Sequence, residues 1–241
     1  MDPLAVRSRQ PEQMDREDID AESYTRVLTD LARVNRWTFT ASPTLHFLAR
    51  AAAGQRHFRL LDVGFGHGDM LRAISRWARR RGIAATLIGI DLNPRSAAIA
   101  GAATPPELGI DFRTGDYRDV AEPLDYVVSS QVAHHMSDAE LATFIAFMEA
   151  RAARGWLISD LRRHRFAHRG FPLLARVLGV HRIVREDGTL SIARSFRAAE
   201  WPPILTAAGI PADAHRIVPR FPFRLAVERI RAGAGSCSAA E

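Results

Sequence analysis

The sequence predicts an α/β fold, in which helices cover both faces of a doubly wound, mainly parallel β-sheet. Three observations predict it: short apolar runs alternate with helical stretches, the runs show no polar face, and acidic or glycine-rich segments follow several of them. Strands that are apolar on both faces are typical of parallel sheets buried between helices. Ligands of such sheets bind beyond the carboxyl ends of the strands, so we expect the functional residues there.

Two helices are expected before the alternating part begins. Apolar residues recur at intervals of three and four over Ala21–Trp37, which indicates an amphipathic helix. A second helix is expected over Ser42–Ala53, with Ser42 as its N-cap and Pro43 as its first residue, and Gly54 would end it.

The alternating part supplies strands and the helices that connect them. Because a crossover between parallel strands is almost always right-handed, this order also sets the winding of the sheet. The strands are expected at Phe58–Val63, Thr86–Ile90, Ile110–Arg113, Leu124–Ser129 and Trp156–Ser159. The connecting helices are expected at Asp69–Arg81, Pro94–Ala103 and Asp138–Ala153.

The pattern changes after the strand at Trp156–Ser159. The segment 161–195 is rich in arginine, contains an apolar stretch expected to be helical near Phe171–Leu178, and carries the turn signal Asp187-Gly188. We expect this segment to be an insert that covers the substrate. A helix at Ala198–Ala208 and two apolar runs, around Ile217 and over Phe223–Val227, complete the chain.

These elements divide the chain into parts of different character. Residues 1–20 are polar and charged, and we expect a flexible arm that becomes ordered only by docking. Residues 21–54 are expected to form an N-terminal helical cap, and residues 55–231 the main domain with its insert. Residues 232–241 are small and polar and are expected to be a disordered tail.

Composition narrows the function classes. Hydrophobic residues make up 47% and charged residues 25% of the 241 residues, which is ordinary for a globular protein. No apolar run approaches the roughly 20 residues that cross a bilayer. The N-terminus lacks the apolar block of a secretory signal, so a cytoplasmic location is expected. The single cysteine, Cys237, excludes an internal disulfide and a cysteine-based zinc site.

The basic residues are all arginine, and the formal net charge is +6. The absence of lysine excludes a Schiff-base or P-loop mechanism that uses lysine. A positive charge is compatible with nucleic-acid binding, but arginines on a solvated surface explain it equally simply. We favour the second interpretation.

The loop after the strand at Phe58–Val63 carries three alternating glycines. In Asp62-Val63-Gly64-Phe65-Gly66-His67-Gly68-Asp69, the glycines allow a positive φ and a close approach of the backbone to a ligand. The dinucleotide fingerprint has a different spacing, G-x-G-x-x-G. Asp69 would also repel a pyrophosphate at the start of the next helix, whereas it suits a cationic ligand.

This loop resembles motif I of class I S-adenosylmethionine-dependent methyltransferases, whose pattern is D/E-x-G-x-G-x-G. The resemblance implies a Rossmann-like, seven-stranded sheet with an antiparallel last strand, and S-adenosyl-L-methionine as the cofactor. The cofactor-binding residues it implies in this loop are Asp62, Gly64, Gly66 and Gly68.

The resemblance extends to the next two strand ends. Asp91 in Gly89-Ile90-Asp91-Leu92-Asn93-Pro94 matches the acidic residue that binds the cofactor ribose, and Leu92 is its neighbour. A carboxylate can accept hydrogen bonds from two adjacent hydroxyls, which suits this role, although capping of the next helix would also explain it. Asp116 and Tyr117 match the residues that bind adenine.

The strand at Leu124–Ser129 leads into the segment Ser130-Gln131-Val132-Ala133-His134-His135. By the same resemblance, Ser130 and Gln131 are expected to contact the methionine part of the cofactor. His134 and His135 are our catalytic candidates, since histidine can act as a general base near neutral pH. A structural role for one of the two remains an equal alternative.

Substrate contacts are assigned to three residues. Asp160-Leu161-Arg162-Arg163 follows the strand at Trp156–Ser159, and this run, with residues 11–15 and 33–36, resembles a subgroup of bacterial secondary-metabolite methyltransferases. We therefore expect Arg36, Asp160 and Arg163 to contact the substrate.

The sequence thus predicts methyl transfer from S-adenosylmethionine to a small molecule, at a hydroxyl of a phenolic, polyketide or lipid-like metabolite. No metal is expected, because Asp160-Leu161 replaces the Asp-Asn pair of catechol-type enzymes. The expected partner is the substrate alone, with no nucleic acid and no membrane span, in a monomer or homodimer. The alternatives are a nucleic-acid methyltransferase, a nicotinamide-dependent oxidoreductase and a non-catalytic cofactor-binding protein.

Overall fold

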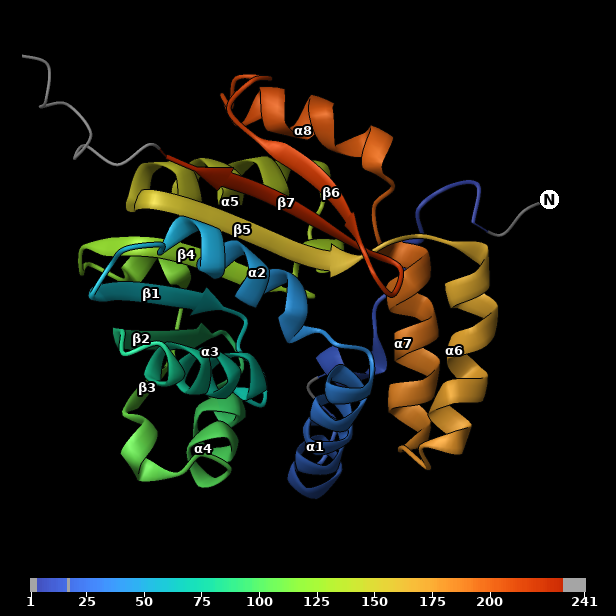
Figure 1. The fold of residues 1–241 in the computed structure, drawn as a ribbon. Coiled ribbons are helices and arrows are strands. Elements are labelled where there is room, and N and C mark those ends of the chain that lie inside the picture. The colour runs from blue at the N-terminus through green and yellow to red at the C-terminus, as the bar shows by residue number, and fades with distance from the viewer. Residues whose placement is uncertain (1–3, 17, 232–241) are drawn as a thin grey trace, which may run out of the picture.

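A computed structural model describes residues 4–16 and 18–231. These residues form a seven-stranded sheet in the order β3-β2-β1-β4-β5-β7-β6 (Figure 1). Strands β1 to β5 are parallel, and β7 runs antiparallel to both of its neighbours. The predicted fold class is therefore confirmed. The strands are β1 His57–Val63, β2 Ala84–Asp91, β3 Ile110–Thr114, β4 Leu124–Ser130, β5 Ala152–Leu161, β6 Arg216–Arg220 and β7 Arg224–Ile230.

Side chains of alternate residues in the central strands pack into two hydrophobic cores, one on each face of the sheet. In β1, Leu60 packs against the core beneath α2, α3 and α4, whereas Leu61 packs against the core beneath α5 and α8. This explains why the strands show no polar face. The helices are α2 Ala41–Ala51, α3 Asp69–Arg80, α4 Pro94–Ala102, α5 Asp138–Arg151 and α8 Trp201–Ala207.

A third group of helices stands at the carboxyl ends of the parallel strands (Figure 1). It consists of α1 Ala21–Trp37 and the hairpin of α6 Arg165–Val177 and α7 Arg182–Arg194, which have a small apolar core of their own that includes Val27, Ala175 and Val184. Short 3₁₀ helices lie at Gln13–Asp15, Pro106–Leu108, Tyr117–Asp119, Ala133–His135 and Ala198–Glu200.

The second helix differs from its prediction in two ways. It begins at Ala41 after Thr40, so Ser42 and Pro43 lie in its first turn and Ser42 is not the N-cap. It also packs on a face of the sheet, where Phe47 meets the ring of Tyr126 edge-on. Residues 21–54 therefore do not form one cap over the carboxyl ends of the strands, because only α1 lies there.

The turn predicted at Asp187-Gly188 is wrong, because both residues lie inside α7. Gly188 is needed there for packing: a Cβ at this position would lie 2.3 Å from Cε1 of Phe171 on α6. Asp187 accepts hydrogen bonds from the backbone N–H groups of Gln13 and Met14, at 3.0 and 2.9 Å. Tertiary contacts therefore override the local turn preference.

The N-terminal segment is docked along this helical group. Leu4 is buried, the backbone N–H of Ser8 donates to the carbonyl oxygen of Ala193, and Ser191 donates to the buried carboxylate of Glu12. The tail predicted at 232–241, with Cys237, lies outside the described residues. Within the described ranges, no helix combines the length and apolar character needed to cross a membrane.

Candidate active site

A cavity of about 1120 Å³ opens beyond the carboxyl ends of the parallel strands. Its walls come from the glycine loop after β1, the end of β2, the segment after β4, and the helices α1, α6 and α7. Pockets for one small ligand usually measure about 300–1,000 Å³. The cavity is therefore large enough for two ligands side by side.

The glycine loop forms the floor of the cavity. Gly64 and Gly66 line it with φ values of 75° and 52°, in the left-handed region that favours glycine. A Cβ at Gly64 would lie 2.4 Å from Cγ2 of Val132, so the loop also needs glycine for close packing. Gly68 does not line the cavity; it precedes α3 and packs against Phe112.

Asp91 at the end of β2 faces the cavity with its carboxylate fixed from two sides. Its Oδ2 accepts the backbone N–H of Gly66 and its Oδ1 that of Asn93, each at 2.9 Å. Burial raises the pKa of Asp91. Each oxygen keeps a further lone pair, so the carboxylate can still accept from two adjacent hydroxyls of a ligand.

Two buried oxygen atoms of the cavity-lining residues have no hydrogen-bond partner in the described part of the chain: Oδ2 of Asp62 and Oγ of Ser130. Burial, with the charges of Asp69 and Asp91, raises the pKa of Asp62 well above its ordinary value. A buried polar atom without a partner costs about 1–3 kcal/mol. These two atoms therefore favour a ligand that brings hydrogen-bond donors.

Arg224, the first residue of β7, adds a buried guanidinium to the same cavity. Its two Nη atoms donate to Oε1 of Gln131 at 3.0 Å and to Oγ1 of Thr38 at 3.1 Å, while its Nε has no partner among the described residues. Burial lowers the pKa of Arg224 to about 10, which leaves it charged at neutral pH. Sequence reasoning missed this residue, although an arginine inside the apolar run Phe223–Val227 was a visible signal.

Gln131 is held in place from several sides. Its backbone has a φ of 60°, a conformation that is costly for a residue with a side chain and that clusters at functional sites. Its Nε2 donates to Oδ1 of Asn35 on α1 at 2.9 Å, and its Oε1 accepts from Arg224. Gln131 therefore joins α1 to the carboxyl ends of β4 and to β7.

Of the two residues predicted to bind adenine, only Tyr117 lines the cavity, and its ring packs edge-on against Phe144 and Phe147. Leu92, predicted to contact the cofactor beside Asp91, lines the cavity as well. Asp116 does not line it, because its carboxylate binds the side chain of Arg118 at 2.6 and 2.9 Å and also accepts the Arg118 backbone N–H.

His134 is buried and tied to Asp160 on β5. Its Nδ1 lies 2.8 Å from Oδ1 of Asp160, and its backbone N–H donates to Oδ2 at 2.8 Å. Burial lowers the pKa of His134, but the carboxylates of Asp160 and Glu12 outweigh that effect and raise it to about 9. Without a ligand His134 is therefore protonated at neutral pH and is a poor proton acceptor. Asp160, predicted to contact substrate, is buried behind His134 and does not line the cavity.

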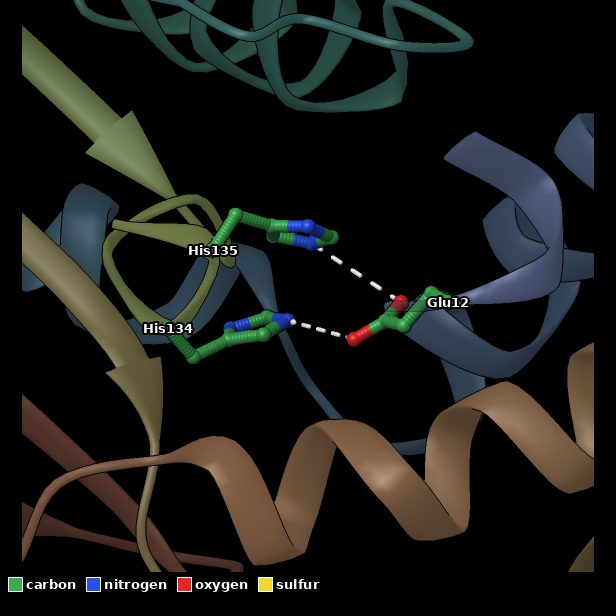
Figure 2. Close-up of side chains that lie close together, drawn as sticks. All are labelled: Glu12, His134 and His135. Carbon is green, nitrogen blue, oxygen red and sulfur yellow. Dashed lines mark ion pairs between the residues drawn. The ribbon is translucent and has the colours of Figure 1, made fainter. Parts of the chain in front are cut away.

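His135 is partly exposed and lies on the cavity wall. Its Nδ1 lies 3.0 Å from Oδ2 of Asp15, and its Nε2 lies 3.8 Å from Oε2 of Glu12. Nε2 of His134 lies 3.5 Å from the other oxygen of Glu12, so both imidazoles point at one carboxylate (Figure 2). Sequence reasoning missed Glu12 and Asp15 as site residues, because it assigned them to a flexible arm.

The two arginines predicted to contact substrate lie elsewhere. Arg163 is buried, and it donates to the carbonyl oxygens of Ser195 at 2.8 Å and Leu4 at 3.1 Å, so it fastens the N-terminal segment. Arg36 is exposed beside a separate surface groove that also includes Arg72 and Trp77. Neither of the two predicted arginines lines the main cavity.

The part of the cavity wall that comes from α6 and the segment before β7 is apolar. Phe166, Phe171 and Leu174 of α6 line it, and so does Phe223 before β7. Phe166 and Phe223 are 60% and 41% exposed, which places aromatic rings where the cavity meets solvent. Such a wall suits an apolar ligand.

Residues 60–155 match a family model described as a methyltransferase domain. That range includes the glycine loop, Asp91, and the segment with Ser130, His134 and His135. No curated protein matches the chain in sequence.

Solved structures show the same fold at low sequence identity. Magnesium protoporphyrin IX methyltransferase from Synechocystis PCC 6803, with bound SAH, is 18% identical over 90% of each chain, with a TM-score of 0.56. The plantazolicin methyltransferase BpumL, in complex with a triazolic desmethylPZN analog and SAH, is 15% identical over 86% of this chain and 90% of its own, with a TM-score of 0.64. Human N-acetylserotonin methyltransferase, in complex with SAM, is 13% identical over 89% of this chain and 57% of its own, with a TM-score of 0.61.

Proposed function

We propose that the protein transfers a methyl group from S-adenosylmethionine to a hydroxyl of an apolar small molecule, since residues 60–155 match a methyltransferase domain and the fold is similar to that of class I methyltransferases. The neighbouring structures with SAM or SAH support this cofactor. The observation that carries the proposal is the set of polar atoms on the cavity wall that lack partners among the described residues.

Those atoms match the groups of the cofactor. The carboxylate of Asp62 and the hydroxyl of Ser130 would accept from the ammonium of the methionine part, and the Nε of Arg224 would donate to its carboxylate. Asp91 would accept from the ribose hydroxyls. Tyr117 and Leu92 would bracket the adenine ring. The negative charge of Asp69 beside this loop suits the positive sulfonium.

The reaction is an in-line displacement in which the acceptor oxygen attacks the methyl carbon. The bond from carbon to oxygen forms as the bond from carbon to sulfur breaks, and the electron pair that stays on sulfur gives the neutral thioether. The hydroxyl proton must leave during this step. The cluster of Glu12, His134 and His135 lies on the wall of the cavity and is the group that we assign to acceptor activation.

The apolar part of the cavity supports a proposal for the acceptor class. The rings of Phe166, Phe171 and Phe223 favour an aromatic or alkyl-bearing acceptor over a charged one. A nucleic-acid acceptor would need cations along its path, and the α6 side of the cavity offers apolar side chains instead. We therefore propose a phenolic, polyketide or lipid-like acceptor that bears a hydroxyl.

The test has two steps. Calorimetric titration with S-adenosylmethionine and S-adenosylhomocysteine should give saturable binding, and NADH under the same conditions should give none. Phenols with alkyl chains of increasing length are then offered with methyl-labelled cofactor, and mass spectrometry identifies the atom that gains the methyl group. Absence of cofactor binding would refute the proposed function. Methylation of carbon or nitrogen alone would refute the acceptor assignment.

A further inference from the structure

A cluster of three side chains, where the N-terminal segment meets the cavity, has the composition and the arrangement of a metal-binding site. Two imidazole nitrogens and one carboxylate, from Glu12, His134 and His135, offer ligand atoms that all lie within 4.8 Å of one another. We propose that these three side chains bind a divalent transition-metal ion, of which Zn²⁺ is the representative. The site itself depends only on the described side chains, and its role in the reaction rests on the proposed function.

The spacing of the ligand atoms supports a cation between them. Nε2 of His134 and Nε2 of His135 lie 3.5 and 3.8 Å from the two oxygens of Glu12. Charge-assisted hydrogen bonds between nitrogen and a carboxylate measure about 2.7–2.9 Å. Ligands about 2.1 Å from a tetrahedral zinc ion stand about 3.4 Å apart. The observed separations exceed the first value and come close to the second.

Each histidine is oriented by a carboxylate behind it. Nδ1 of His134 lies 2.8 Å from Asp160, and Nδ1 of His135 lies 3.0 Å from Asp15. A carboxylate on the far nitrogen is the usual partner of a metal-binding histidine, because it fixes the ring and the tautomer. Both Nε2 atoms are thereby turned toward Glu12 (Figure 2).

The charges of the cluster also favour a cation. Glu12, Asp15 and Asp160 contribute three carboxylates, and the guanidinium of Arg194 approaches Glu12 at 3.8 Å. Glu12 is buried, so its charge is poorly screened by water. A divalent ion would compensate the excess negative charge of these carboxylates.

Two nitrogens and one carboxylate are the protein ligands of several catalytic zinc sites, which leave a position for water or substrate. All three ligands line the cavity, so that position would face the acceptor. An acceptor hydroxyl bound there would lose its proton to solvent more readily, since a bound Zn²⁺ lowers the pKa of its water ligand to about 7. The resulting oxygen anion would then attack the methyl carbon.

Metal binding is tested on the full chain without an affinity tag, after removal of metals with EDTA and dialysis. Titration with ZnCl₂ in a calorimeter should show one equivalent bound. Glu12→Gln and His135→Ala should abolish this binding. Asp15→Asn should weaken it by about 10–100-fold, because it removes the carboxylate that orients the ring of His135. His57→Ala is the matched control, since His57 is exposed at the amino end of β1 and should bind as the unmodified chain does.

Binding of S-adenosylmethionine, measured on the same samples, shows that each variant is folded. If a variant does not fold, Co²⁺ added to the unmodified chain provides the second test, because a site with mixed nitrogen and oxygen ligands of low coordination gives intense visible absorption. Absence of Zn²⁺ binding to the unmodified chain, or equal binding by the three cluster variants, would overturn the proposed site. Zn²⁺ binding without cofactor binding would leave the site in place and refute the proposed function.

Discussion

Asp160 holds His134 with both oxygens of its carboxylate, one on the imidazole Nδ1 and one on the backbone N–H, each at 2.8 Å. The contact joins the end of β5 to the segment after β4, and both residues are buried. It thereby fixes the rotamer of His134 and the start of the short 3₁₀ helix at Ala133–His135.

The first prediction follows from this contact. Asp160→Ala leaves the His134 backbone N–H and a protonated imidazole buried without their carboxylate. Breaking a buried ion pair costs about 3–5 kcal/mol, so we expect a loss of that size in the free energy of unfolding. Urea unfolding followed by circular dichroism measures it. Asp213→Ala, at an exposed position, is the control and should change the free energy by less than about 0.5 kcal/mol. A loss of that small size in Asp160→Ala would contradict the buried pair.

The second prediction concerns Asp91 and the cofactor ribose. Asp91→Asn keeps the size of the side chain and one acceptor oxygen, but it loses the charge that strengthens hydrogen bonds to hydroxyls. We expect S-adenosylmethionine to bind roughly 10–100-fold more weakly, since hydrogen bonds to a charged group contribute about 1.5–3 kcal/mol. Calorimetry measures this change, and Asp111→Asn on the neighbouring strand β3 is the control. Unchanged affinity in Asp91→Asn would rule out the ribose assignment.

The third prediction separates stability from binding at Asp62. Burial raises its pKa above that in the unfolded chain, so Asp62 lowers the stability of the ligand-free fold as the pH rises from the ordinary carboxyl pKa through the raised one. Asp62→Asn removes this cost, and we expect a higher Tm without ligand at pH 7.5, by roughly 2–4 °C for each kcal/mol gained. The gain should shrink as the pH falls toward the ordinary carboxyl pKa of about 3.9.

The same variant should bind S-adenosylmethionine more weakly, because an amide replaces the carboxylate that would pair with its ammonium group. Differential scanning fluorimetry with and without cofactor measures both effects. A variant that is less stable and binds the cofactor normally would show that Asp62 serves the fold alone.

The fourth prediction tests the contact between α6 and α7. Gly188→Ala should destabilise the fold by about 1–3 kcal/mol, since the new methyl group would overlap the ring of Phe171. Gly170→Ala on α6 is the matched control, because nothing lies within 4 Å of its Cβ position and alanine should stabilise that helix by up to about 1 kcal/mol. Adding Phe171→Leu to Gly188→Ala should restore part of the loss. Equal effects at the two glycines would show that helix propensity, rather than the ring, decides.

Much of the fold was predictable because its signals are local. The strands β1 to β5 follow from short apolar runs, and the position of Asp91 follows from a strand that ends in an acidic residue before Asn93-Pro94. Asn93 indeed caps α4 with its side chain, and Pro94 is the first residue of that helix. Such patterns depend on neighbours in sequence, which a reader of the chain can see.

The missing parts of the site depend on contacts between distant segments. Glu12 is held at the cavity by a hydrogen bond from Ser191. Arg224 is held there by hydrogen bonds to Gln131, Thr38 and Thr40. In each case the partners are far from the residue in sequence. The opposite error occurred at Asp116, where an arginine two residues away neutralises the predicted ligand-binding carboxylate. Periodicity reports which face of an element is buried, but it does not report which remote side chain meets it.

The docking of Glu12 on α7, and of Arg224 on the connection between α1 and α2, has a consequence for protein synthesis. Glu12 is synthesised early. Ser191, which donates to Glu12, is synthesised only when about four fifths of the chain is complete. Arg224 follows later still, within the last strand. In a nascent chain that already has β1 to β4, the glycine loop is therefore exposed to water. The cavity becomes enclosed only when synthesis is nearly complete. Premature termination between residues 195 and 223 should yield a protein that has the first five strands but lacks Arg224 in the cavity wall.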